Sequence, residues 1–177
     1  MSKLVFDIEA NGLLDTVDTV WCMVIKNIDS KDRFIFDCVS DNLHSSNWID
    51  IFLGNTIIGH NIISYDIPLL RKMYGIDLVE LLGNESIIDT YSYSQVLFPD
   101  RPMPKGCPTS LLNPVTNKSK SVGPHGLESW AWRVGERKLA IHDWTTFTPE
   151  IIERCKGDVD INEKVYYALV KEAGLLP

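Results

Sequence analysis

The sequence has no uninterrupted apolar stretch of roughly 18 residues, and its beginning shows no apolar run of the kind found in signal peptides. We therefore expect a protein that neither spans a membrane nor is exported. The sequence also has no CxxC motif, and none of its 4 cysteines has a histidine at the spacing of a zinc ligand. These cysteines are Cys22, Cys38, Cys107 and Cys155. We interpret them as reduced thiols that serve mostly in packing, which fits a cytoplasmic protein.

Positive charge is also scarce in this chain. Its 17 lysines and arginines are outnumbered by 24 aspartates and glutamates, which gives a net charge of −7 and a pI of about 5.0. Broad electrostatic binding to duplex nucleic acid needs a basic face, so the composition argues against it, whereas a site that grips a few terminal nucleotides is allowed. With 45% hydrophobic content, residues 1–177 suit a single domain with a substantial core.

Two acidic residues lie within the first predicted strand. The segment 3–13 opens with an apolar run that predicts a strand covered on both faces. Asp7 and Glu9 are two positions apart in this strand. Because side chains alternate along an extended chain, both carboxylates should point to the same side.

A third acidic residue lies where a strand gives way to a helix. The β-branched run at 56–59 predicts a buried strand, and Pro68 and Gly75 mark the start and the stop of a helix that Asp66 opens. Asp66 would then sit at the carboxyl end of a strand, which is where ligands bind in open α/β sheets. The alternative is that Asp66 only caps the helix.

The fourth acidic residue is Asp158, in a helix predicted over 148–174, for which we allow a break near Gly157. Arg154 lies one turn before Asp158 and should share its face. If the four carboxylates pack together, they repel one another and their pKa values rise unless a cation neutralises them. A pair of divalent metal ions is the simplest answer.

The remaining segments predict further strands and helices around this set. We expect strands at 20–25, 33–38 and 86–89, helices at 42–53, 91–98 and 125–134, and a long loop at 99–124. Asp89 is interpreted as the cap of the helix that follows it. Lys105, Lys118 and Lys120 give the loop a local positive charge, which suits either contact with a nucleic-acid backbone or plain solvation.

Three motifs in this order resemble those of the DEDD 3′–5′ exonucleases, and most closely the proofreading domain of podovirus-type family-A DNA polymerases. The motifs are Phe6-Asp7-Ile8-Glu9-Ala10-Asn11-Gly12-Leu13, the segment from Gly59-His60-Asn61 through Asp66, and Asp158, with further similarity at 88–90, 125–130 and 135–136. The resemblance spans nearly the whole chain. Together with the element order, it implies an α/β ribonuclease-H-like fold whose five-stranded mixed sheet is flanked by helices.

The resemblance also implies an activity, which is the removal of nucleotides from DNA 3′ ends with two Mg²⁺ or Mn²⁺ ions as cofactors. Asp7 would bridge both ions, Glu9 and Asp158 would hold the one that activates water, and Asp66 would help to hold the other. The implied substrate is a single-stranded or frayed DNA 3′ end, and a DNA polymerase subunit is an implied partner. We expect a monomer, located in the host cytoplasm if a bacteriophage encodes it.

Three further positions match places where the family contacts the substrate strand. Leu13 matches a residue that wedges between terminal bases, although a leucine at a strand end can also be ordinary packing. Asn61 and Tyr65 lie where the second motif touches the strand. We therefore include all three as candidate substrate-binding residues.

One catalytic position departs from the family pattern. The polymerase branch carries a tyrosine four residues before the last aspartate, and the other branch a histidine five before it, whereas this chain has Arg154 and Glu153. The residue that usually orients the attacking water is thus absent, which affects the expected rate more than metal binding. Two alternatives remain open, namely a catalytically impaired protein that keeps the fold for binding or regulation, and a small-RNA 3′–5′ exonuclease.

Overall fold

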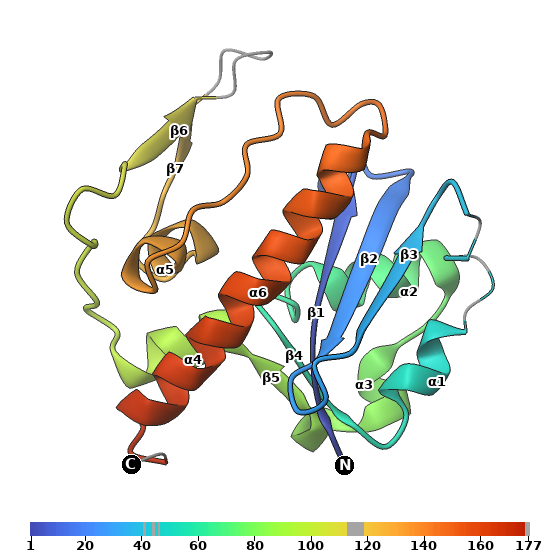
Figure 1. Ribbon diagram of the computed structural model, residues 1–177, viewed down its shortest axis with the longest axis horizontal. Coiled ribbons are helices and arrows are strands. Elements are labelled where there is room, and N and C mark those ends of the chain that lie inside the picture. Colours follow the sequence, from blue (N-terminus) through green and yellow to red (C-terminus); the bar gives the residue numbers. More distant parts are fainter. Residues whose placement is uncertain (41, 44, 46, 113–118, 176–177) are drawn as a thin grey trace.

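The computed structural model describes residues 1–40, 42–43, 45, 47–112 and 119–175. A mixed sheet lies at its centre. Its strands are β1 (Lys3–Ala10), β2 (Val20–Asn27), β3 (Arg33–Asp37), β4 (Thr56–Gly59) and β5 (Ile87–Asp89). They pair in the order β3-β2-β1-β4-β5, with β1 to β3 antiparallel and with β4 and β5 parallel to β1 (Figure 1). This is the five-stranded mixed sheet that the element order predicts.

Helices cover both faces of this sheet. They are α1 (Trp48–Phe52), α2 (Asp66–Tyr74), α3 (Leu78–Leu82), α4 (Thr90–Leu97), α5 (Leu127–Arg133) and α6 (Pro149–Glu172), with a 3₁₀ turn η1 (Asn84–Ser86) before β5. Helices α1 to α3 pack on one face and α6 crosses the other (Figure 1). Along β1, Leu4 and Phe6 pack with the first group and Val5 packs with α6. Asp7 and Glu9 share the Val5 side, so the alternation of the strand directs both acids toward α6.

Helix α6 is continuous over 24 residues, so the break allowed for near Gly157 does not occur. A glycine inside a helix costs about 1 kcal/mol relative to alanine. The fully buried Cys155 and Val159 on either side of it pack against the sheet and hold the helix together. The helix begins with Pro149 at its first position, as predicted, and Thr148 is the N-cap residue without a side-chain capping bond.

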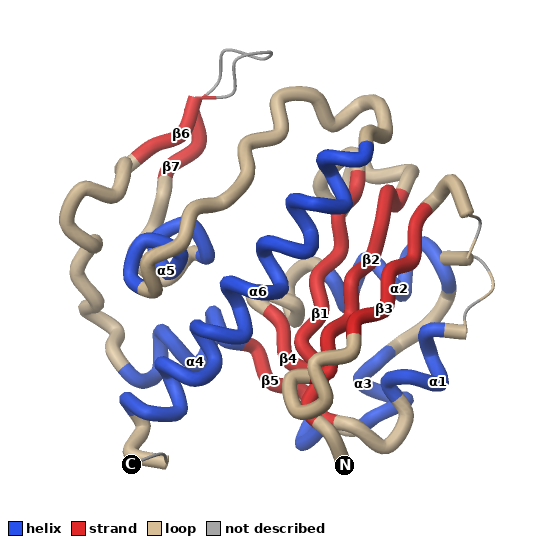
Figure 2. The backbone as a smooth tube through the Cα atoms, viewed as in Figure 1, coloured by secondary structure: helices blue, strands red, loops and turns tan. Residues whose placement is uncertain are grey.

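Two predictions of local structure were wrong. Of the helix expected over 42–53, the described residues form only α1, and the described residues 42, 43, 45 and 47 before it are in turns. The loop expected over 99–124 contains a small hairpin of β6 (Ser110–Leu112) and β7 (Ser119–Ser121), which pair only with each other and stand apart from the main sheet (Figure 2). All six residues of these two strands are exposed, so no apolar alternation indicated them. Lys118 lies outside the described residues.

A third apolar cluster joins α5 to α6. Leu127, Trp130 and Ala131 pack against Ile161 and Val165. Trp130 is therefore a core residue. Among the helices that the structure describes, none combines the length and the apolar character needed to cross a membrane.

Candidate active site

Strand β1 and helix α6 bring three carboxylates together. Each of Asp7, Glu9 and Asp158 offers one carboxylate oxygen, and these oxygens all lie within 4.8 Å of one another. The contact between the two elements is close at this point, because the Cys155 thiol donates to the backbone carbonyl of Asp7 at 3.3 Å. Residues 148 positions apart in the sequence therefore belong to one acidic site.

Asp66 enters the same site from the turn between β4 and α2. It is the first residue of α2, whereas Tyr65 occupies the N-cap position without a side-chain capping bond. The alternative that Asp66 only caps the helix is therefore wrong. Its side chain is buried, and this burial, together with the charge of Asp7, raises its pKa. Asp66 stays outside the set of three oxygens that lie within 4.8 Å.

The turn that carries Asp66 is held by Asp89 at the end of β5. One Asp89 oxygen accepts from the backbone N–H of Asn61 at 2.9 Å and the other from that of Ile63 at 3.1 Å. Asp89 also caps α4, as predicted, by accepting from the backbone N–H of Tyr91 at 2.9 Å and of Ser92 at 3.3 Å. A single buried carboxylate thus fixes both the turn of the second motif and the start of the next helix.

The packing of the acids raises their pKa values. Burial, and secondarily the charge of Asp158, raises the pKa of Asp7 from 3.8 to about 7. Burial and the charge of Asp7 raise the pKa values of Glu9 and Asp66 well above their ordinary range. A cluster in which three acids resist ionisation is one that a cation would stabilise.

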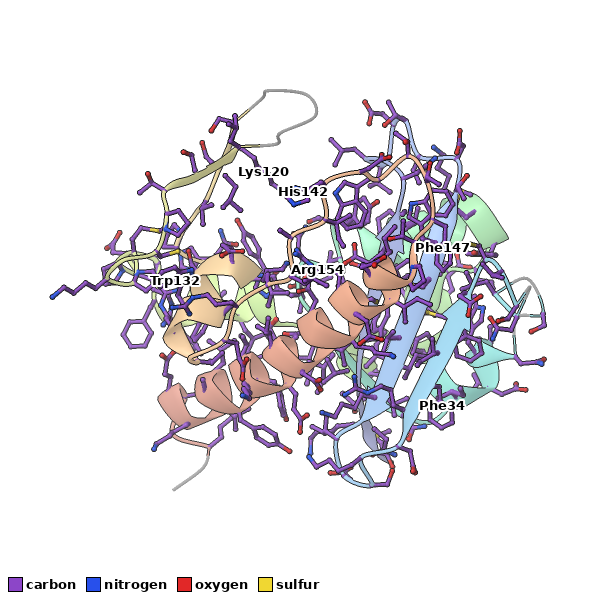
Figure 3. The ribbon with its side chains drawn as sticks, turned by 45° about the horizontal axis from the view of Figure 1, so that its top comes forward. Phe34, Lys120, Trp132, His142, Phe147 and Arg154 are labelled. Carbon is purple, nitrogen blue, oxygen red and sulfur yellow. The ribbon has the colours of Figure 1, made fainter. Side chains whose placement is uncertain are left out.

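Two cations of the chain itself already reach this cluster. The Lys138 ammonium lies 2.7 Å from Asp158 Oδ2, and the Arg154 Nε lies 3.0 Å from the same oxygen and 3.7 Å from Glu9 Oε1. Burial acts to lower the pKa of Arg154, but the charges of Asp158 and Glu9 outweigh it and raise that pKa. Figure 3 shows Arg154 on the side of α6 that faces the segment carrying His142.

The pairing of Arg154 with Asp158 follows the predicted shared helix face. Lys138 was missed by the sequence interpretation. It follows the Gly135–Glu136 pair of the family resemblance, but no spacing rule relates a lysine on a connecting segment to an aspartate further along the chain.

The three candidate substrate-binding residues lie at the turns beside the cluster. The Tyr65 hydroxyl donates to the Gly12 carbonyl at 2.5 Å, which joins the second motif to the end of the first. Leu13 is 70% exposed, so the alternative that it is ordinary packing is wrong. Asn61 adopts a left-handed conformation with φ of 66°, and this forms the turn that leads toward Asp66.

The donor atoms suit a divalent ion. Asp66 Oδ1 and Asp158 Oδ1 are buried and have no hydrogen-bond partner among the described residues. A buried carboxylate oxygen without a partner is costly unless a cation satisfies it. Mg²⁺ and Mn²⁺ prefer oxygen ligands of this kind, so the residues present fit the predicted cofactors.

The raised pKa of Asp7 leads to a prediction for the protein without metal. An acid whose pKa rises from 3.8 to about 7 on folding makes the folded state less stable as the pH increases between these values. Replacing Asp7 with asparagine removes this loss. We expect Asp7→Asn to raise the melting temperature more at pH 8 than at pH 5 in the presence of chelator. The exposed Asp15→Asn is the control, and an equal change at both pH values for Asp7→Asn would contradict the pKa shift.

Comparison with known proteins finds similar sequences and similar structures. No protein-family model matches the chain. The chain is 26% identical to the DNA-directed DNA polymerase of Escherichia phage T7 over 98% of its own length, and it spans 27% of that polymerase. The solved structure of Brucella melitensis NrnC with bound Mg²⁺ matches with a TM-score of 0.62 at 14% identity, over 98% of this chain and 76% of that one.

A second structure, the EXO domain of Aedes aegypti Nibbler, matches with a TM-score of 0.63 at 13% identity, over 97% of this chain and 79% of that one. The predicted ribonuclease-H-like fold is therefore confirmed. The resemblance to phage DNA polymerases is confirmed by the sequence, and the fold is shared with solved nuclease structures.

Proposed function

We propose that this chain is a metal-dependent 3′–5′ exonuclease that removes nucleotides from DNA 3′ ends, and that residues 1–177 form one exonuclease domain. The observation that carries the proposal is the meeting of Asp7, Glu9 and Asp158 within 4.8 Å, beside Asp66, in a fold shared with exonucleases. The buried oxygens without partners among the described residues support a divalent ion at this place. The relationship to a phage polymerase supports DNA as the substrate and proofreading as the role.

Each acid has a proposed role toward Mg²⁺ or Mn²⁺. Asp7 would contribute to holding both ions, Glu9 and Asp158 would hold one of them, and Asp66 would help to hold the other. When bound, such ions stabilise the attacking and leaving oxygens of an in-line displacement at phosphorus. The polar atoms that hold them come from β1, α2 and α6, which are rigid elements, so the ligands keep their positions without substrate.

The chain's other residues position the DNA strand. Leu13 is exposed at the end of the first motif and can insert beside the terminal base, while Tyr65 and Asn61 flank the path toward Asp66. Arg154 stays protonated at any usable pH, so it cannot take a proton from water. Its place is that of the family's water-orienting tyrosine.

One observation favours a second candidate, a catalytically impaired protein that binds 3′ ends. Arg154 pairs with Asp158, which is a proposed metal ligand. The two candidates differ in a simple assay, in which a single-stranded oligonucleotide is incubated with Mg²⁺, with Mn²⁺ or with chelator and the released nucleotides are measured. Release that requires the metal supports the exonuclease, and binding without any release supports the impaired protein.

The charge of the chain predicts how it handles duplex DNA. With a net charge of −7, the chain can neutralise few phosphates, so its affinity for duplex DNA should be low and should fall only shallowly with salt. We expect distributive trimming, with mismatched or frayed 3′ ends digested faster than paired ones. Digestion of paired and mismatched primer ends can be compared on a sequencing gel. Processive digestion of fully paired ends would contradict the prediction.

The phage relatives are DNA polymerases of which this chain spans 27%. We propose that the exonuclease acts together with a polymerase, which would provide the affinity for duplex DNA that this acidic chain is expected to lack. Lys120, an exposed basic group on the β6–β7 hairpin, is a candidate contact for a nucleic-acid backbone in the described part of the loop (Figure 3).

A further inference from the structure

The two cations at the cluster are Lys138 and Arg154, and neither is among the residues proposed to hold a metal ion. Their side chains are only 14% and 17% exposed. Both contact the same atom, Asp158 Oδ2, while Oδ1 of that carboxylate has no partner among the described residues. The arrangement leaves one oxygen free for an ion and uses the other to hold two positive charges.

The contacts around Arg154 tie these charges to one segment of the chain. Arg154 Nη1 donates to the backbone carbonyl of Leu139, which is the neighbour of Lys138. The segment after α5 is therefore fastened to α6 by Lys138 and Arg154 together. Lys138 reaches Asp158 from the connection between α5 and α6, and Arg154 reaches it from α6 itself.

Charge balance indicates what happens when the site is loaded. Asp7, Glu9, Asp66 and Asp158 carry four negative charges when ionised, and Lys138 with Arg154 supplies two positive ones. A divalent ion bound to Asp158 would neutralise its carboxylate and weaken the two ion pairs that Lys138 and Arg154 form with it. A nearly buried cation without a partner is costly, so each would then need another anion. In the proposed reaction, the substrate strand brings such an anion, which is the phosphate next to its 3′ end.

We propose that Lys138 and Arg154 bind the phosphate at the 3′ end of the strand. Without metal, both cations pair with Asp158, and binding of a divalent ion to that carboxylate frees them for the phosphate. This inference rests on the proposed function. Arginine and lysine are well suited to it, since a guanidinium offers several donors to phosphate oxygens and an ammonium acts as a compact point charge. Binding of the ion and binding of the strand are thereby coupled through these two side chains.

Removing the charge of Asp158 should release the two cations without any metal. We expect Asp158→Asn to bind a fluorescent single-stranded oligonucleotide about tenfold more tightly than the wild type in chelator, measured by anisotropy. Adding Lys138→Gln or Arg154→Gln to this variant should remove most of the increase in affinity. The slope of log affinity against log salt should also steepen by about 0.7 for each additional phosphate that the variant neutralises.

Two matched controls separate this effect from a general change in charge. Asp66→Asn makes the same acid-to-amide substitution in the same site, but no ion pair links Asp66 to either cation among the described residues. Lys156→Gln in the Asp158→Asn background removes a cation of the same helix that pairs outward with Glu153. The proposal would be overturned if Asp158→Asn and Asp66→Asn increased the affinity for the oligonucleotide equally. It would also be overturned if Lys156→Gln and Lys138→Gln reduced the affinity of the Asp158→Asn variant equally.

A second measurement keeps the proposal testable if Asp158→Asn does not fold. Calorimetric binding of a deoxynucleoside monophosphate in Mg²⁺ should be about tenfold weaker for Lys138→Gln than for the wild type and unchanged for Lys156→Gln. Unchanged binding by Lys138→Gln would overturn the inference. Metal-dependent nucleotide release by the wild type is scored separately, so the proposed function can stand while this inference fails.

Discussion

Replacing Asp7 with asparagine is expected to lower the rate of nucleotide release by at least about 10²- to 10⁴-fold, the range for groups that stabilise or orient reacting atoms. One carboxylate oxygen of Asp7 lies within 4.8 Å of oxygens of Glu9 and Asp158, and the charge of Asp7 adds to the effect of burial in raising the pKa of Asp66. Asp7 therefore interacts with each of the other proposed metal ligands. Asparagine keeps the size of the side chain and removes its charge. Release of nucleotides from a single-stranded substrate at saturating Mg²⁺ measures the effect.

Stability separates this loss from misfolding. Because burial raises the pKa of Asp7, the variant should melt at the same or a higher temperature than the wild type in chelator near pH 8. The control is again Asp15→Asn, which changes an exposed acid near the end of the same motif. An Asp7→Asn variant that folds and keeps a rate within about threefold of the wild type would remove Asp7 from the active site.

Replacing Asp89 with alanine is expected to destabilise the fold by about 3–5 kcal/mol, because a buried carboxylate that accepts several hydrogen bonds is lost and its donors are left unpaired. Its four donors are the backbone N–H groups of Asn61, Ile63, Tyr91 and Ser92. Denaturant unfolding measures this change in the free energy of unfolding. The turn before Asp66 loses its anchor as well, so activity should fall at temperatures where the variant is still folded.

Asp77 provides a matched control for Asp89. It caps α3 by accepting from the backbone N–H groups of Val79 and Glu80, but it holds no second segment through backbone N–H groups among the described residues. Asp77→Ala should therefore cost about 1 kcal/mol, the usual loss for a helix cap. The difference between the two variants measures the bonds to the β4–α2 turn, and equal losses would show that Asp89 is an ordinary cap.

The sheet and the shared orientation of Asp7 and Glu9 could be predicted from alternation along the strands, whereas Asp66 was predicted from the end of a strand and Asp158 from the order of the motifs. In β1, apolar residues occupy both faces, and the two acids at its end share one side. The glycine at the end of β4 has a steric reason. A Cβ on Gly59 would lie 2.0 Å from Ile62 Cγ2, so the tight turn there requires a glycine.

The features that the sequence did not predict are those fixed by tertiary contact. Lys138 belongs to a connection without regular structure, and only the packing of that connection onto α6 brings its ammonium to Asp158. The β6–β7 hairpin is exposed throughout its two strands, so these strands carry no apolar pattern. The pairing of Arg154 with Asp158 was indicated by their helical spacing, but the contact of Arg154 with Glu9 depends on the packing of α6 against β1.

The most direct test of the account is the digestion of a 5′-labelled single-stranded DNA oligonucleotide, with products sized on a sequencing gel in Mg²⁺, in Mn²⁺ and in chelator. We expect a ladder that shortens from the full length one nucleotide at a time in either metal and no digestion in chelator. A label released first as a short 5′ product, internal fragments, or a ladder that persists in chelator would contradict a metal-dependent enzyme acting from the 3′ end.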